Sequence, residues 1–189
     1  MNLGLVHHED VFRELEQTYS DDPRRYHTLR HIEQCLQEFD EVRHLAKEPA
    51  AVELALWFHD AIYDPRESDN EEQSARMLRR MVESPFTEEA IALIFATKHE
   101  RLHLEQDAAL VCDIDLAILG KPPQDFDVYE RQIRYEYDWV PEQAYREGRA
   151  KLLMKFMARQ SIYATGVFQD RYEVQARNNL QRSISRLTK

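Results

Sequence analysis

The chain has 189 residues, enough for one domain with a substantial hydrophobic core. Only 4 residues are glycine, which rules out a glycine-rich phosphate loop and disfavours a β-sandwich or β-barrel. The 35 acidic and 25 basic residues give a formal net charge of −10, and such a surface repels DNA, RNA and anionic lipid. We therefore expect no nucleic-acid or membrane partner, whereas a small anionic substrate is compatible with a local basic pocket.

The sequence also predicts a cytoplasmic protein. No apolar run approaches the ~18 residues that a membrane helix needs, and the first ten residues lack the basic-then-apolar order of a signal peptide. Cys35 and Cys112 are the only cysteines, and neither belongs to a C-x-x-C pair. We expect both thiols to be reduced.

Helical periodicity dominates the chain. Ser20 to Pro23 read as a cap followed by proline, and apolar residues then recur three and four apart from Leu29 to Val42. Pro49 opens the strongly apolar segment 51–58, which we expect to lie in the middle of the domain. Further helices are predicted at about 69–81, 87–97, 108–119, 126–137, 142–163 and 170–187. The only β-branched candidate strand, 110–115, is short and has no partner.

These elements predict an all-α fold of about eight to nine helices in a single domain, 1–189. Its core is expected at about 24–120, with C-terminal helices at 124–187 packed on it. The pattern of the C-terminal helices fits two arrangements equally, a cover over a pocket or the face of a homodimer.

Three places combine polar groups with otherwise apolar helices. His27 and His31 are four residues apart and so project from one helix face. The pair His59-Asp60 ends the apolar segment, where a buried carboxylate requires a partner or a cation. Two further carboxylates, Asp113 and Asp115, lie in an apolar stretch and point in different directions on a helix, so that one of them is expected to face inward.

Together, His31, His59, Asp60 and one of the two later aspartates form a mixed nitrogen and oxygen set. Two neutral imidazoles and two carboxylates would neutralise a divalent cation and leave positions for water and substrate. The absence of thiolates from this set argues against a structural zinc site. Each residue also has a plain structural role open to it, such as a hydrogen-bonded helix end at His59-Asp60 or a backbone contact at Asp113.

The order H…HD…D on a helical scaffold resembles the HD-domain superfamily of metal-dependent phosphohydrolases. More closely, the chain resembles a bacterial family of predicted HD phosphohydrolases whose substrate is unknown. The motifs that carry this resemblance extend from about Arg24 to Leu180 and comprise RRYHTLRHI, WFHDAIYD, DNEEQSA, ATKH, DIDLAILG, IRYEY, the region around Gly148-Arg149, and YEVQARNNL.

The resemblance implies an HD-like helical bundle, one divalent metal ion (Mn, Mg, Fe, Ni, Co or Zn) and hydrolysis of a small phosphate ester or nucleotide. It assigns the metal ligands to His31, His59, Asp60 and Asp115, the last of which fits better than Asp113. His27 corresponds to the general acid of the distantly related cyclic-nucleotide phosphodiesterases.

Weaker assignments concern residues that would touch substrate or support the ligands. Lys98 would offset charge on the phosphoryl oxygens, and His99 would touch the phosphate or a second metal, with His103 one turn further on. Glu71 and Asp113 are also candidates to contact the substrate or to support the metal ligands, although capping a helix explains Glu71 equally well.

Two other functions share the same fold. A non-catalytic HD protein would bind a nucleotide or a metal as a sensor or assembly module. A two-iron HD oxygenase would need more metal ligands than can be assigned in the sequence.

Overall fold

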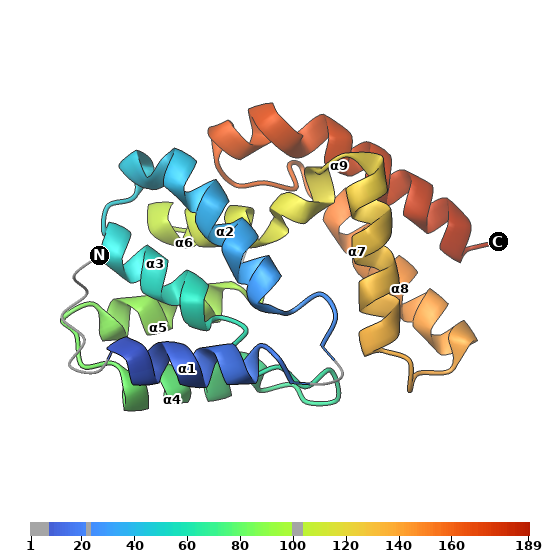
Figure 1. The fold of residues 1–189 in the computed structure, drawn as a ribbon. Coiled ribbons are helices and arrows are strands. Elements are labelled where there is room, and N and C mark those ends of the chain that lie inside the picture. Colours follow the sequence, from blue (N-terminus) through green and yellow to red (C-terminus); the bar gives the residue numbers. More distant parts are fainter. Residues whose placement is uncertain (1–7, 22–23, 100–103) are drawn as a thin grey trace.

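The computed structural model of the chain describes residues 8–21, 24–99 and 104–189, and the regular structure within these ranges is entirely helical (Figure 1). It comprises nine α-helices: α1 (His8–Thr18), α2 (Leu29–Val42), α3 (Pro49–Phe58), α4 (Asn70–Met81), α5 (Thr87–Ala96), α6 (Gln106–Asp115), α7 (Pro123–Glu136), α8 (Glu142–Met157) and α9 (Gly166–Leu187). Two short 3₁₀ segments, η1 (Arg43–Leu45) and η2 (Leu116–Gly120), follow α2 and α6. The predicted all-α fold is confirmed. Within the described ranges, none of the helices has the length and apolar character needed to cross a bilayer.

Helix α3 lies at the centre of the N-terminal part. Nearly all of it is buried, and it packs against α2, α4, α5 and α6. This burial follows from its composition, because a helix that is apolar on every face is stable only when it is covered on every face. The helix ends at Phe58, so that His59 and Asp60 follow directly at its carboxyl end.

The segment that contained the β-branched candidate strand is helical. Residues 110–115 belong to α6, and the chain then tightens into η2. This 3₁₀ segment packs closely on α9: a Cβ atom at Gly120 would come within 2.4 Å of the Cβ of Tyr172. Only glycine allows this approach, which joins the end of α6 to the C-terminal helices.

The C-terminal helices form a second group of elements. In Figure 1, α1 to α5 gather on one side of the molecule and α7 and α8 on the other, while α9 extends along η2 and α8. A pocket described below is lined by residues from both groups.

Two predicted boundaries need correction, and one helix was not predicted. The unpredicted helix is α1, whose inward face carries Val11 and Leu15. The helix predicted at 142–163 ends at Met157, and the last helix begins at Gly166 rather than near residue 170. Between them the chain forms a loop, because side-chain carboxylates bind its backbone amides in place of helical carbonyls.

Candidate functional site

The fold brings together four of the residues singled out by the sequence. His31 comes from the first turn of α2, His59 and Asp60 follow the end of α3, and Asp115 is the last residue of α6. We refer to these four residues as the His/Asp cluster. Both histidines are almost fully buried, whereas the two carboxylates keep a partial exposure toward a pocket.

The side-chain atoms of this cluster approach one another closely. The Nε2 atoms of His31 and His59 are 3.2 Å apart. His31 Nε2 lies 3.2 Å from Asp115 Oδ1 and 3.5 Å from Asp60 Oδ2. His59 Nε2 lies 3.1 Å from Asp60 Oδ2 and 3.6 Å from Asp115 Oδ1. Each imidazole therefore faces both carboxylates.

These separations match the spacing of ligands around a single cation. With metal–ligand bonds of about 2.1 Å, adjacent ligand atoms are about 3.0 Å apart in octahedral geometry and about 3.4 Å in tetrahedral geometry. The observed range, 3.1 to 3.6 Å, spans both values. These separations are compatible with a single cation bound between the two imidazoles and the two carboxylates.

A thiol that the sequence analysis did not assign to the site also lies here. Cys35 is one helical turn after His31, and its Sγ lies 3.7 Å from both ring nitrogens of that histidine. Ligand atoms of His31, Cys35, His59 and Asp115 all lie within 4.8 Å of one another, so that these four residues are an alternative ligand group. Cys35 does not line the pocket, whereas Asp60 does.

The charges in the cluster stabilise one another. Burial lowers the pKa of His59, but Asp60 and Asp115 outweigh it and hold that pKa well above its usual value. Burial raises the pKa of Asp115, but hydrogen bonds from His31, His59 and His99 hold it well below its usual value. Burial is outweighed at His31 by Cys35, Tyr26 and the two aspartates, which hold the pKa well above its usual value. At Asp60, burial is outweighed by His59, His27 and His31, which hold the pKa well below its usual value. The imidazoles and carboxylates thus favour one another's charged forms, and a divalent cation could take over this role from imidazole protons.

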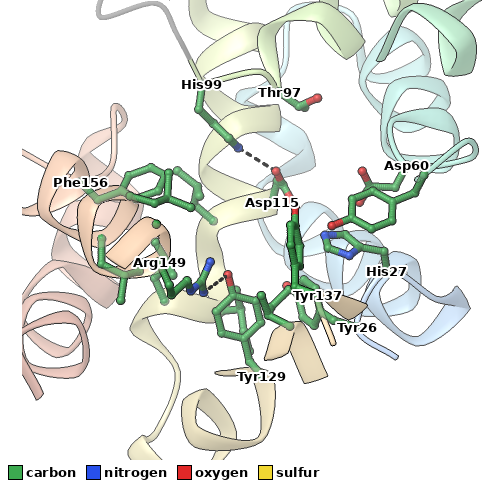
Figure 2. Close-up of a pocket in the computed structure, with 18 of the residues that line it drawn as sticks. Tyr26, His27, Asp60, Thr97, His99, Asp115, Tyr129, Tyr137, Arg149 and Phe156 are labelled. Atoms are coloured by element: carbon green, nitrogen blue, oxygen red, sulfur yellow. Dashed lines mark hydrogen bonds and ion pairs between the residues drawn. The ribbon is translucent and has the colours of Figure 1, made fainter. Parts of the chain in front are cut away.

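Outer hydrogen bonds orient two of the candidate ligands. The Nδ1–H of His59 donates to the carbonyl of Leu56 at 3.0 Å, which directs the lone pair of Nε2 into the cluster. The second oxygen of Asp115 accepts a hydrogen bond from His99 Nε2 at 2.9 Å (Figure 2). His99 has a positive φ of 55°, an uncommon conformation outside glycine that often occurs at functional sites.

A cavity of about 500 Å³ opens beside the cluster. Asp60 and Asp115 lie in its wall, and Figure 2 shows them on one side of the space, with Arg149 and Phe156 on the opposite side. A volume of this size is typical of small-molecule sites. The cavity also contacts four of the other predicted site residues: His27, Glu71, Lys98 and His99.

His27 is oriented by a buried carboxylate. Its Nδ1 lies 2.7 Å from Oε2 of Glu136, the last residue of α7, and its ring stacks on Tyr63 with 3.8 Å between centroids. The other oxygen of Glu136 accepts hydrogen bonds from the backbone amides of Arg25, Tyr26 and His27. With Nδ1 bonded to Glu136, the Nε2 atom of His27 is the ring nitrogen left for the pocket.

Lys98 lines the pocket and forms ion pairs with α4. Its ammonium group lies 2.7 Å from Glu72 Oε1 and 3.8 Å from Glu71 Oε2. Because two carboxylates share its charge, Lys98 offers a phosphate less attraction than an isolated cation would.

Asp113 forms hydrogen bonds with the backbone and does not face the pocket. Its carboxylate accepts hydrogen bonds from the amides of Ala164 and Thr165 and from the Thr165 hydroxyl, each at 2.6 to 2.7 Å. Asp113 does not line the cavity. Of the roles that the sequence left open for Asp113, the structure shows the backbone contact, through which it holds the loop between α8 and α9. His103 lies outside the described residues.

Three residues of the site were not predicted as such. These are Glu136, Arg149 and Cys35. The four-residue spacing from His31 is a sequence signal for Cys35. The role of Glu136 depends on a contact across more than 100 residues, for which a single sequence provides no signal.

Comparisons of the chain with protein-family models, with curated proteins and with solved structures find no significant match.

Proposed function

We propose that the protein is a metal-dependent phosphohydrolase that acts on a small phosphate ester. The observation that carries the proposal is the convergence of two imidazoles and two carboxylates at ligand spacing beside a cavity that also contains His27. The resemblance of the sequence motifs to HD phosphohydrolases supports the same reaction.

His31, His59, Asp60 and Asp115 would hold one divalent cation. We favour Asp60 over Cys35 as the fourth ligand because it approaches both histidines and faces the pocket. When bound, such a cation supplies a Lewis acid that lowers the pKa of water and polarises a phosphoryl oxygen.

The surrounding side chains would move the protons. The carboxylate of Asp60 faces the pocket and accepts the proton of the attacking water. On the leaving side, His27 donates a proton from Nε2 to the oxygen of the departing alcohol. Glu136 positions the ring for this step through its bond to Nδ1. Lys98 lies at the edge of the site, where its charge would act on the phosphoryl oxygens jointly with Glu71 and Glu72.

A matched pair of variants tests the proposal. Asp115→Asn keeps the size of a ligand and removes its charge, and Asp113→Asn makes the same change two residues away at a side chain that binds only the loop. Chelator-treated protein is assayed with added Mn²⁺ against phosphomonoesters, nucleotides and cyclic dinucleotides. We expect turnover by the wild type, a loss of about 100-fold or more in Asp115→Asn and little change in Asp113→Asn.

Two results would contradict the proposal. One is equal turnover by wild type and Asp115→Asn. The other is saturable binding of a phosphate compound without any product, which would instead favour a sensor or assembly protein.

A further inference from the structure

The cavity extends beyond the space that a phosphate group needs. We call the part of the cavity that is formed by α7 and α8 the outer chamber. It is lined by Tyr129, Ile133, Tyr145, Gly148, Arg149 and Leu152. Its walls are apolar and aromatic, so that this part of the pocket suits an organic group rather than a second phosphate.

Arg149 is the charged group of the outer chamber, and it is fixed in place. The side chain is nearly buried, and its Nη2 and Nε groups donate to one carboxylate oxygen of Glu130. Nη2 also donates to the hydroxyl of Tyr129 at 2.8 Å, and the guanidinium lies over that ring. The second oxygen of Glu130 accepts from the hydroxyl of Ser183 at 2.6 Å. Within the described residues, this network leaves Nη1 of Arg149 as the nitrogen without a hydrogen-bond partner.

The pairing with Glu130 determines what Arg149 can recognise. Because a full carboxylate already balances the guanidinium, a second anion gains little net attraction in the outer chamber. A neutral acceptor, such as a carbonyl oxygen or a ring nitrogen, can still take a hydrogen bond from a charged donor. Figure 2 shows Arg149 and Tyr129 together on the side of the pocket opposite His27 and Asp60.

The aromatic walls favour a flat ligand. Tyr129 packs edge-on against Tyr26, with 4.6 Å between centroids, and Tyr145 adds another ring to the lining. A planar ring in a ligand can make stacked or edge-to-face contacts with each of these side chains. Gly148 borders the cavity as an exposed residue, and a Cβ atom added there would meet no atom within 4 Å.

We propose that the outer chamber binds the organic part of the substrate, a planar ring that carries a hydrogen-bond acceptor, with Arg149 donating to the acceptor and Gly148 bordering the space. The assignment of this ring to a substrate rests on the proposed function. The existence of the binding site does not, because nucleosides, which have no phosphate, can occupy it alone.

The test uses the full chain without added metal and the nucleosides adenosine, guanosine, cytidine and uridine as probes, with binding measured by calorimetry or NMR titration. Gly148→Leu adds a bulky side chain at the edge of the outer chamber. Gly166→Leu is the matched control, since a Cβ at Gly166 also meets nothing within 4 Å and this residue does not line the pocket. We expect saturable binding of at least one nucleoside, a loss of about tenfold or more in Gly148→Leu and a change of less than about twofold in the control.

A second variant tests the hydrogen bond. Arg149→Met is combined with Glu130→Gln so that no buried carboxylate is left unpaired. We expect nucleoside affinity to fall by about tenfold, while binding of inorganic phosphate in the presence of Mn²⁺ is unchanged. Unchanged nucleoside affinity in a folded double variant would overturn the role of Arg149.

The outcomes separate this inference from the proposed function. Absence of binding for all four nucleosides to folded wild type overturns the outer-chamber site, even if phosphate esters are hydrolysed. Equal binding by Gly148→Leu and wild type also overturns it. Nucleoside binding that Gly148→Leu abolishes, in a protein that hydrolyses no phosphate ester, supports the site and contradicts the hydrolase.

Discussion

Replacement of Glu136 by glutamine tests how the N-terminal and C-terminal groups of helices are joined at the pocket. This carboxylate is only 1% exposed and accepts four hydrogen bonds, from three consecutive backbone amides and from His27. Glutamine keeps one oxygen for the amides, removes the charge and presents an amide group to Nδ1 of His27.

The size of the effect follows from these bonds. A hydrogen bond to a charged group contributes about 1.5–3 kcal/mol, against about 1 kcal/mol for a neutral one. Desolvation of the buried carboxylate offsets part of the difference, so that we expect Glu136→Gln to cost about 2 kcal/mol. In a domain of this size the loss corresponds to a decrease in Tm of about 4–8 °C.

The loss should also depend on pH. Burial raises the pKa of Glu136, but His27 and the backbone amides outweigh it and hold the pKa below the ordinary value of 4.5. A carboxyl group with a lowered folded-state pKa adds stability above its unfolded value, and this stability disappears as the pH falls through the folded value. The difference in Tm between wild type and Glu136→Gln is therefore expected to be full at neutral pH and to shrink in acid.

Thermal unfolding at several pH values is the assay. Glu147→Gln is the control, because Glu147 is an exposed residue of α8 and its replacement should change stability by less than about 0.5 kcal/mol. Equal effects of the two variants, or a difference in Tm that is the same at neutral and acid pH, would refute the reasoning.

Three further predictions concern single positions. His27→Asn should lower kcat by about 10²–10⁴-fold, as loss of a general acid does, and leave the metal content of the purified protein unchanged. Asp113→Asn should lower the Tm by an amount that corresponds to about 1–2 kcal/mol, because an NH₂ group replaces one of the two carboxylate oxygens that accept hydrogen bonds from backbone amides. The affinity for Mn²⁺ should not change. Gly148→Ala should raise the Tm, since alanine is favoured over glycine in a helix by about 1 kcal/mol and its Cβ has open space.

Much of the fold could be predicted from local patterns. The uniformly apolar segment before His59 predicted a central helix, and α3 is central because such a helix must be covered on all faces. The end of α8 could not be predicted in this way. Its amphipathic pattern continues past Met157, and the helix stops there as distant carboxylates, among them Asp113, bind the following backbone.

The part of the candidate site that could be predicted consists of residues whose type and apolar surroundings already indicate a chemical role. Histidines and aspartates in apolar surroundings indicated the cluster, because such groups are costly to bury without a partner. The partners themselves lie far along the chain. Glu136 reaches His27 from α7, and Arg149 is paired with Glu130 across two helices, so that their roles become apparent only in the folded molecule.

The central claim is that His31, His59, Asp60 and Asp115 bind one divalent cation. A calorimetric titration of chelator-treated protein with Mn²⁺ tests it most directly. We predict one ion per wild-type chain, affinity weaker by about tenfold or more in Asp60→Asn, and affinity within about threefold of wild type in Cys35→Ala. No binding by the wild type, or the same affinity in wild type and Asp60→Asn, would contradict the account.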